Sequence, residues 1–200
     1  MNFTPSSIAA LIVAASFAAG LNVYATVATL GLLARFHWVV LPPGLDSLSS
    51  PWIVVSASLL FAVEIFADKI PAFDLLWNAA HTFIRVPIAA LLAYKAASQL
   101  SPELQLLAAL AGAAISALAH TSKTAARALV TPSPEPLSNI ALSAGEDVAA
   151  VSLTWLATHH PYLAGGIATV AIVVLLFSLQ WIVVRLRRLS HRLFHPETAQ

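Results

Sequence analysis

Long hydrophobic stretches alternate along the chain with short polar breaks. Two of the stretches, Ile8–Ala34 and Tyr162–Val184, contain no Asp, Glu, Lys or Arg. Each is longer than the roughly 20 apolar residues with which a helix crosses a hydrocarbon core of about 30 Å. The pattern therefore predicts a membrane-spanning helix at each position, and with them an integral membrane protein.

Four less regular apolar segments lie between these two, and polar residues interrupt each of them. Their expected bounds are Trp52–Ile70, Asp74–Tyr94, Leu104–Val130 and Leu137–Ala157. Proline and glycine end helices, and they mark the breaks at Pro42–Gly44, Lys69–Pro71, Ser101–Pro102, Pro132–Pro136 and His159–Pro161. We predict an all-α fold, a polytopic membrane bundle of about six spans. Four spans with two re-entrant segments are the alternative.

The composition agrees with a membrane bundle and excludes several kinds of chemistry. Of the 200 residues, 59% are hydrophobic and 10% are charged. The chain has no cysteine, which excludes disulfides, cysteine metal sites and cysteine nucleophiles. A net charge of +1 gives no basic footprint for a nucleic-acid partner. The first stretch lacks a basic flank and exceeds the ~7–15 residues of a signal-peptide core, so we expect it to be retained.

Basic residues orient the predicted spans. Four arginines follow the last span directly, Arg185, Arg187, Arg188 and Arg192, and the positive-inside rule places such a cluster in the cytoplasm. Six spans put both termini on that side, together with eight of the ten Lys and Arg residues. We predict a multi-pass protein of the bacterial inner membrane, with one transmembrane domain over residues 1–184 and a basic cytoplasmic tail over residues 185–200. A lipid-surface helix is the alternative for the tail.

Some charged residues must lie at membrane depth. Trp52–Val63 supplies only twelve apolar residues before Glu64, and Val86–Tyr94 supplies only nine. Neither segment reaches the length of a span without the polar residues beside it. Glu146 and Asp147 fall near the middle of another predicted span. Because buried charges in a membrane are costly, we expect them to face the interior of the bundle and to pair.

The polar residues recur at helical spacing, which places them on shared faces. The stripes are Asp74, Asn78, His81 and Arg85; Ser116, His120, Lys123 and Arg127; Glu64 and Asp68; Asn139, Ser143 and Glu146; and Asn22, Thr26 and Thr29. With Lys69 and Glu135 added, the acidic and basic residues of the central segments nearly balance. A buried network can therefore pair most of them.

Two comparable halves, residues 8–100 and 103–184, suggest an inverted repeat of three spans each, which is a common transporter plan. Small residues let helices approach closely or form a homodimer interface; they are Gly20, Ala25, Ala28, Gly112, Ala113 and Ala117. The stretch TPSPEPLSN, residues 131–139, breaks the second half. Such irregular backbone either lines a water-filled cavity or forms a tight cytoplasmic loop.

Four motifs stand out in chain order: GLNVYATVATLGLLAR (residues 20–35), EIFADKIPAFDLLWNAAHTFIR (64–85), SPEPLSN (133–139) and GEDV (145–148). Together they resemble a family of bacterial membrane proteins called domain of unknown function 4126. The resemblance implies a multi-span membrane protein and brings no activity with it. The positions of this chain that the resemblance matches to family motif residues are Asn22, Glu64, Asp68, Lys69, Pro71, Asp74, Trp77, His81, Arg85, His120, Lys123, Arg127, Ser133, Glu135, Asn139, Glu146 and Asp147. Val86 before Pro87 is a departure from the family pattern.

Ionisable residues within a membrane indicate a functional site by default. We therefore predict a small transporter or channel for an ion or a small polar solute. The acids Glu64, Asp68, Glu146 and Asp147 would bind a cation or relay protons, and Lys123 and Arg127 would neutralise them or hold an anion. The full candidate site is Asn22, Glu64, Asp68, Lys69, Asp74, Asn78, His81, Arg85, His120, Lys123, Arg127, Glu135, Asn139, Ser143, Glu146 and Asp147.

Two other functions remain open. The charged network can serve only to hold the bundle together, because buried ion pairs can specify an arrangement without adding stability. An intramembrane enzyme is less favoured, since the chain lacks HExxH and GxSxG motifs. We expect no catalytic residue, no cofactor and no metal. The expected partners are the lipid bilayer and an unidentified solute or ion.

Overall fold

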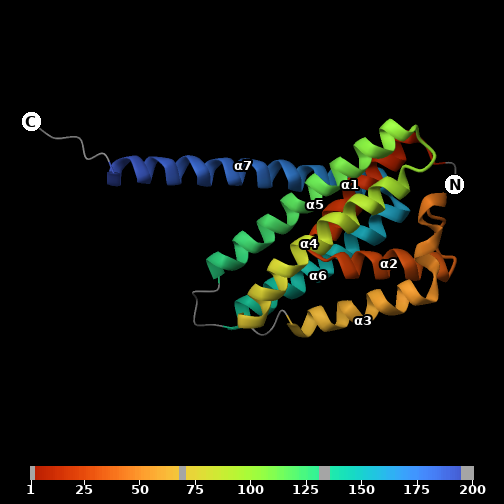
Figure 1. Cartoon of the computed structure of the whole chain (residues 1–200), viewed down its shortest axis with the longest axis horizontal. Coiled ribbons are helices and arrows are strands. Elements are labelled where there is room, and N and C mark those ends of the chain that lie inside the picture. The colour runs from red at the N-terminus through yellow and green to blue at the C-terminus, as the bar shows by residue number, and fades with distance from the viewer. Residues whose placement is uncertain (1–2, 68–70, 131–135, 195–200) are drawn as a thin grey trace, which may run out of the picture.

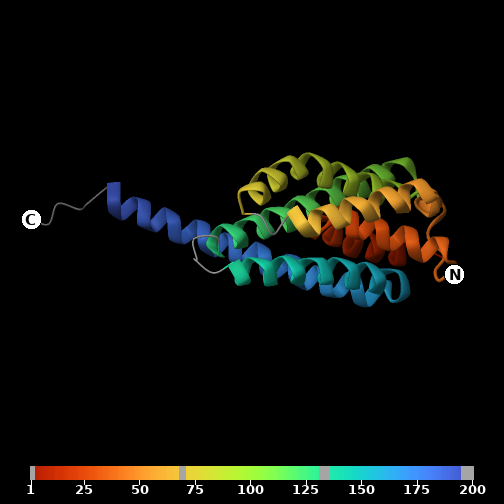
Figure 2. The same ribbon diagram turned by 90° about the horizontal axis from the view of Figure 1, so that it is seen from below.

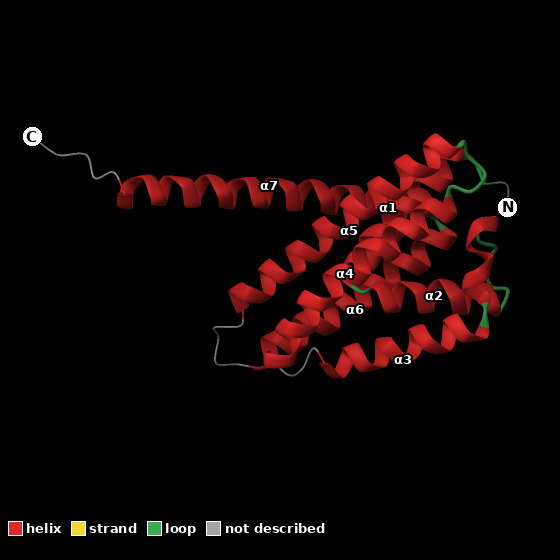
Figure 3. Cartoon of the chain, viewed as in Figure 1, coloured by secondary structure: helices red, strands yellow, loops and turns green. Residues whose placement is uncertain are grey.

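The structure is a computed structural model that describes residues 3–67, 71–130 and 136–194. Side chains are described throughout these ranges except at residues 71–79, 126–130, 136–139, 182–183 and 186–194. The described residues form helices and no strand (Figure 3). The elements are α1 (Pro5–Leu21), α2 (Val23–Arg35), the short 3₁₀ helix η1 (Pro43–Ser49), α3 (Pro51–Ala67), α4 (Pro71–Ala96), α5 (Pro102–Val130), α6 (Pro136–His159) and α7 (Pro161–Phe194). The all-α prediction is confirmed.

Proline sets the start of almost every helix. Each of these elements except α2 begins with a proline. The first helical position needs no backbone N–H, and the fixed φ of proline suits it. Five of the six predicted spans accordingly correspond to single helices, α3 to α7. Their bounds lie within a few residues of those expected, except that α7 continues ten residues beyond Val184 to Phe194.

The first predicted span is wrong as a single helix, because the chain breaks at Asn22. This residue has an extended backbone (φ −149°, ψ 105°). Its N–H donates to Ala18 O at 2.9 Å, while its side-chain oxygen accepts from Ala25 N at 2.9 Å. Asn22 therefore ends α1 and caps α2 at the same time, and Asn is among the preferred N-cap residues.

The chain reverses direction at this break. Figure 1 shows α1 running inward from the N-terminus and α2 returning toward the same end of the bundle. A cavity at that end is lined by Phe3 and Thr4 from the start of the chain and by Val40 and Leu41, which follow α2. The two helices have 17 and 13 residues, shorter than a span. They form a helical hairpin.

The remaining helices run between the two ends of the bundle (Figures 1 and 2). By length and composition, three stretches of the described residues can each cross a membrane: Pro102–Ala125, Ile140–His159 and Pro161–Trp181. η1 and α3, bent by 69° at their junction, form a fourth candidate. The chain is thus a helical membrane protein, and the prediction of about six spans is not confirmed.

The N-terminus and the C-terminal end of the last helix lie far apart in the molecule (Figure 1). Figure 1 places the N-terminus and the C-terminal end of α7 at opposite ends of the molecule, with α7 projecting beyond the other helices. The first apolar stretch begins and ends at the same end of the bundle (Figure 1). The predicted placement of both termini on the cytoplasmic side is not confirmed.

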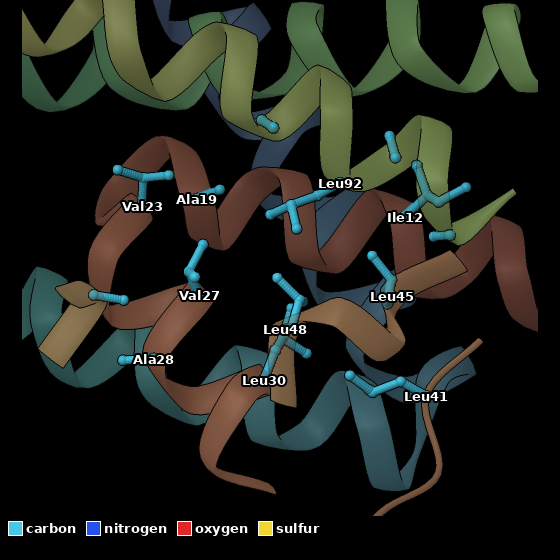
Figure 4. Packing of buried hydrophobic residues seen from close by; sticks show 14 of the residues in the cluster. Ile12, Ala19, Val23, Val27, Ala28, Leu30, Leu41, Leu45, Leu48 and Leu92 are labelled. Carbon is cyan, nitrogen blue, oxygen red and sulfur yellow. The ribbon is translucent and has the colours of Figure 1, made fainter. Parts of the chain in front are cut away.

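Two apolar clusters share α1 as their common element. One joins α1 to α2, η1 and α4 through side chains such as Ile12, Val27, Leu45 and Leu92 (Figure 4). The other joins the opposite side of α1 to α5, α6 and α7 and includes many alanines. The hairpin is therefore packed inside the bundle rather than against lipid.

Small residues allow this close packing, as predicted. A Cβ on Gly20 would lie 2.6 Å from Ser116 O, and one on Gly112 would lie 2.6 Å from Ala93 Cβ. The chain's own helices thus cover these glycines, which the sequence also offered as a dimer interface. Large apolar side chains instead point outward on the surface that lipid would contact, including Phe66, Phe83, Leu110, Val170 and Phe177.

The proposed inverted repeat stays a prediction, and the two halves open differently. The first half begins with the α1–α2 hairpin, whereas the second begins with the continuous 29-residue helix α5. The first half is interrupted at Asn22, whereas α5 continues without a break.

Candidate functional site

Charged and polar side chains from five segments meet at the tip of the hairpin. Seven of the residues that the sequence singled out are at most 9% exposed here. They are Asn22 between α1 and α2, Glu64 on α3, Arg85 on α4, His120 and Lys123 on α5, and Glu146 and Asp147 on α6. Asp147 follows the start of α6 by eleven residues, or about 16 Å at a rise of ~1.5 Å per residue. The cluster therefore lies at membrane depth.

Arg85 joins three helices. Its Nη2 donates to Glu64 Oε1 in a buried ion pair between α4 and α3. Its Nη1 lies 3.0 Å from His120 Nδ1 on α5. A guanidinium group can only donate, so His120 Nδ1 is the acceptor.

The contacts of His120 define its protonation. Because Nδ1 accepts from Arg85, the ring proton lies on Nε2, which donates to Thr82 Oγ1 at 2.8 Å. His120 is therefore the neutral Nε2–H tautomer. A second proton on Nδ1 would face the guanidinium and break this contact. His120 thus acts as an acceptor between two helices rather than as a cation.

Lys123 connects α5 to the end of α1. Its Nζ donates to Leu21 O at 3.1 Å and lies 3.0 Å from Glu146 Oε2. Glu64 Oε1 is farther away, at 3.9 Å. Leu21 is the last residue of α1, and the last carbonyls of a helix have no partner within it. A cation at a helix C-terminus is also favoured by the helix dipole.

Asp147 connects α6 to the start of α2. Asn22 Nδ2 donates to Asp147 Oδ1 at 2.8 Å, while the other side-chain atom of Asn22 caps α2. A carboxylate near a helix N-terminus is favoured by the dipole, as a cation is at the other end. Each end of the broken helix thus faces a charge of the sign that the helix dipole favours. Lys123 is the cation at the end of α1, and Asp147 is the carboxylate at the start of α2.

Two threonines extend the polar contacts beside the hairpin. Thr154 Oγ1 donates to Ala150 O at 2.6 Å and lies 3.5 Å from Thr26 Oγ1. Thr26 Oγ1 in turn donates to Asn22 O at 2.9 Å. Both threonines are fully buried. Thr26 was part of a predicted polar stripe, and its buried position agrees with the inward face expected for that stripe.

His81 contacts a residue that the sequence analysis did not single out. Its Nε2 lies 2.9 Å from the hydroxyl oxygen of Tyr24, and the two rings meet edge to face at 5.4 Å. In an unbroken helix, Tyr24 would lie about 200° away from Asn22 and outside its polar stripe. Only the break at Asn22 brings both residues to the network. The sequence analysis also did not single out Thr82 or the Leu21 carbonyl, which belong to the network.

The remaining predicted site residues have different outcomes. Ser143 is buried on α6, about one turn before Glu146. Asp68, Lys69 and Glu135 lie outside the described residues, and so do the side chains of Asp74, Asn78, Arg127 and Asn139. Within the described part of the chain, no three His, Asp or Glu side chains are grouped so as to hold a metal ion.

A cavity of about 320 Å³ opens at the end of the bundle where α1 begins. Its polar lining includes Thr4, His159 and Tyr162, and the Tyr162 hydroxyl lies 3.2 Å from Thr4 Oγ1. Ala14, Ala18 and Leu153 belong to the apolar cluster between this cavity and the buried network. The cavity is therefore separated from the charged side chains in this conformation.

The comparison with known families agrees with this arrangement. The family model described as "Domain of unknown function (DUF4126)" matches residues 9–181. The chain belongs to this family. The matched region of this DUF4126 protein includes most of the hairpin, all the charged residues of the network and most of α7. Neither the curated proteins nor the solved structures contain a significant match.

Proposed function

We propose that this DUF4126 protein is a small transporter or channel that moves an ion or a small polar solute across the membrane. One observation carries the proposal. A helix is broken at membrane depth, and buried charged side chains from two other helices, Lys123 and Asp147, contact its two ends. Broken helices whose ends meet ions or charged groups are typical of transporter binding sites.

The cavity adds to this support. It opens at one end of the bundle, and the neighbouring apolar cluster contains small residues such as Ala14 and Ala18. A barrier of small side chains can open through a modest shift of helices, as alternating access requires. The proposal treats the network as a binding and passage site and assigns it no catalysis.

The charge distribution suggests an orientation. The arginines at positions 185, 187, 188 and 192 follow the membrane-crossing part of α7, at the end of the molecule opposite the N-terminus. By the positive-inside rule, we propose that this end is cytoplasmic in a bacterial inner membrane. The N-terminus and the cavity then face the other side.

A purely structural role is the alternative, and one observation favours it. The basic groups of Arg85 and Lys123 both contact carboxylates, so these buried charges are matched without any solute. Such pairs can specify how helices assemble. Water access distinguishes the two functions, because a packed structural network is dry whereas a passage is hydrated.

The test uses the absence of natural cysteines. Ser143→Cys places a thiol one turn from Glu146, and Ala168→Cys places one in the apolar cluster as a dry control. We expect a membrane-impermeant maleimide to label Ser143→Cys but not Ala168→Cys in membrane vesicles. Equal protection of both thiols, from either side, would favour the structural role.

A flux measurement completes the test. Proteoliposomes with the wild type should dissipate a K⁺, Na⁺ or proton gradient faster than empty liposomes. Glu146→Gln should abolish this flux, whereas Glu103→Gln, at an exposed helix start, should leave it unchanged. Fully active Glu146→Gln protein would mean that the network is not the site.

A further inference from the structure

The ammonium group of Lys123 is held as a small cation would be. Oxygens from two distant segments contact it, Leu21 O at 3.1 Å and Glu146 Oε2 at 3.0 Å. A backbone carbonyl and a carboxylate are the ligand types that hard cations prefer. The C-terminal end of α1 adds the partial negative charge of its dipole. All three residues meet at the break in the first apolar stretch.

We propose that the Leu21 carbonyl and the Glu146 carboxylate form a binding site for a monovalent inorganic cation, which the Lys123 ammonium occupies in the conformation described. The inference rests on the proposed transport function and names its substrate class, Na⁺ or K⁺. The ammonium acts as a tethered competitor for the site. An ammonium group and a free cation that shared these two ligands would repel each other strongly in a buried environment. They therefore exclude each other from the site.

The surroundings favour a monovalent over a divalent ion. The group now in place carries a single positive charge, and the Glu146 carboxylate and the Leu21 carbonyl both contact it. A divalent ion would need more carboxylate ligands at short range.

A second carboxylate lies near the ammonium group of Lys123. Glu64 Oε1 lies 3.9 Å from its Nζ, and the lysine side chain is flexible along its four-carbon stem. When the stem carries the ammonium past Glu64 and away from the end of α1, it leaves Leu21 O and Glu146 to a cation from solution. The exchange needs only movement of the side chain and entry of one ion.

Thermal unfolding of the purified protein in detergent tests the site. The probes are KCl, NaCl and N-methyl-D-glucamine chloride at equal ionic strength. In Lys123→Met the stem remains and the charge is lost, so the site is open to a free cation. We expect saturating K⁺ or Na⁺ to raise its Tm by about 5–10 °C over N-methyl-D-glucamine. The wild type should need about tenfold more salt for the same shift, because its own ammonium competes.

Matched variants make the result specific. The response should disappear in Lys123→Met/Glu146→Gln, and Lys95→Met, at an exposed lysine in the last turn of α4, should respond as the wild type does. Lys123→Gln serves as a second neutral variant if Lys123→Met does not fold. The same Tm in all three salts for the neutral variant that folds would overturn the proposal. A salt response that survives Glu146→Gln would also overturn it.

Failure of this inference is distinguishable from failure of the proposed function. If wild-type proteoliposomes support a flux but the Lys123 variants show no cation-specific shift, the cation site is wrong and transport stands. If the cation shift appears without any flux in the wild type, the site stands and the transport proposal fails. The ⁸⁶Rb⁺ bound by Lys123→Met, compared with Lys123→Met/Glu146→Gln, gives a readout independent of stability.

Discussion

The side-chain nitrogen of Asn22 donates to Oδ1 of Asp147 across 2.8 Å, although 125 residues separate them in the sequence. The same Asn22 side chain caps α2 through its oxygen. One amide therefore uses its donor and its acceptor for different purposes, a contact with α6 and the start of a helix. This links the local break in the chain to the packing of the bundle.

Exchanging these two residues should be tolerated better than changing either one. In Asn22→Asp the cap survives, but two carboxylates then face each other without a donor. We expect this variant to lose about 2–4 kcal/mol, in the range for a buried charge without its partner. In Asn22→Asp/Asp147→Asn the amide donates from the other side, so most of the loss should be recovered. The Tm in detergent measures both effects.

Asn22→Ala serves as the control for this pair. It removes the cap and the donor together, so the exchange cannot rescue it, and Asn22→Ala/Asp147→Asn should remain destabilised by about 1 kcal/mol through the cap alone. An exchanged protein no more stable than Asn22→Asp would contradict the role assigned to this hydrogen bond.

The tautomer of His120 makes a second prediction. The side-chain oxygen of asparagine can replace Nδ1 as the acceptor for Arg85, whereas leucine offers no acceptor. His120→Asn should therefore be more stable than His120→Leu by about 1.5–3 kcal/mol, the value of a hydrogen bond to a charged group. Chemical denaturation in mixed micelles measures the difference. Equal stability of the two variants would mean that Arg85 does not depend on this acceptor.

Close packing at Gly20 makes a third prediction. A methyl group there would lie 2.6 Å from the Ser116 carbonyl and 2.7 Å from Ala119 Cβ. The backbones of α1 and α5 must separate to admit it, so Gly20→Ala should cost about 1–3 kcal/mol. Gly145→Ala is the matched control, because nothing lies within 4 Å of a Cβ at that site.

The control should even gain stability, since alanine favours helix over glycine by about 1 kcal/mol. Monodispersity and Tm after purification report both changes. Equal effects at the two glycines would show that α1 does not pack on α5 as closely as described.

The α1–α2 hairpin makes a fourth prediction, about topology. Ser6 at the start of α1 and Gln99 after α4 lie at one end of the bundle, and Arg185 on α7 lies toward the other. Single cysteines at Ser6 and Gln99 should therefore react with an impermeant maleimide from the same face of the membrane. A cysteine at Arg185 should react from the opposite face. Labelling of Ser6→Cys and Arg185→Cys from the same face would contradict this arrangement and would instead indicate an even number of membrane crossings.

Much of the helical architecture follows from local sequence. Prolines at positions 51, 71, 102, 136 and 161 start helices wherever the chain allows, because proline suits the first helical turn and ends the preceding helix. The spacing of Ser116, His120 and Lys123 puts them on one face of α5 through helix geometry alone. Burial of all three agrees with this prediction.

The break at Asn22 was decided by tertiary contacts. Apolar residues surround it on both sides, and apolar periodicity there gives no sign of a reversal. A helix end at membrane depth leaves backbone groups without partners, which is costly away from water. Lys123 on α5 donates a hydrogen bond to Leu21 O, and Asp147 on α6 accepts one from the Asn22 side chain. Those partners come from residues more than 100 positions away, so only the folded chain can make the broken helix stable.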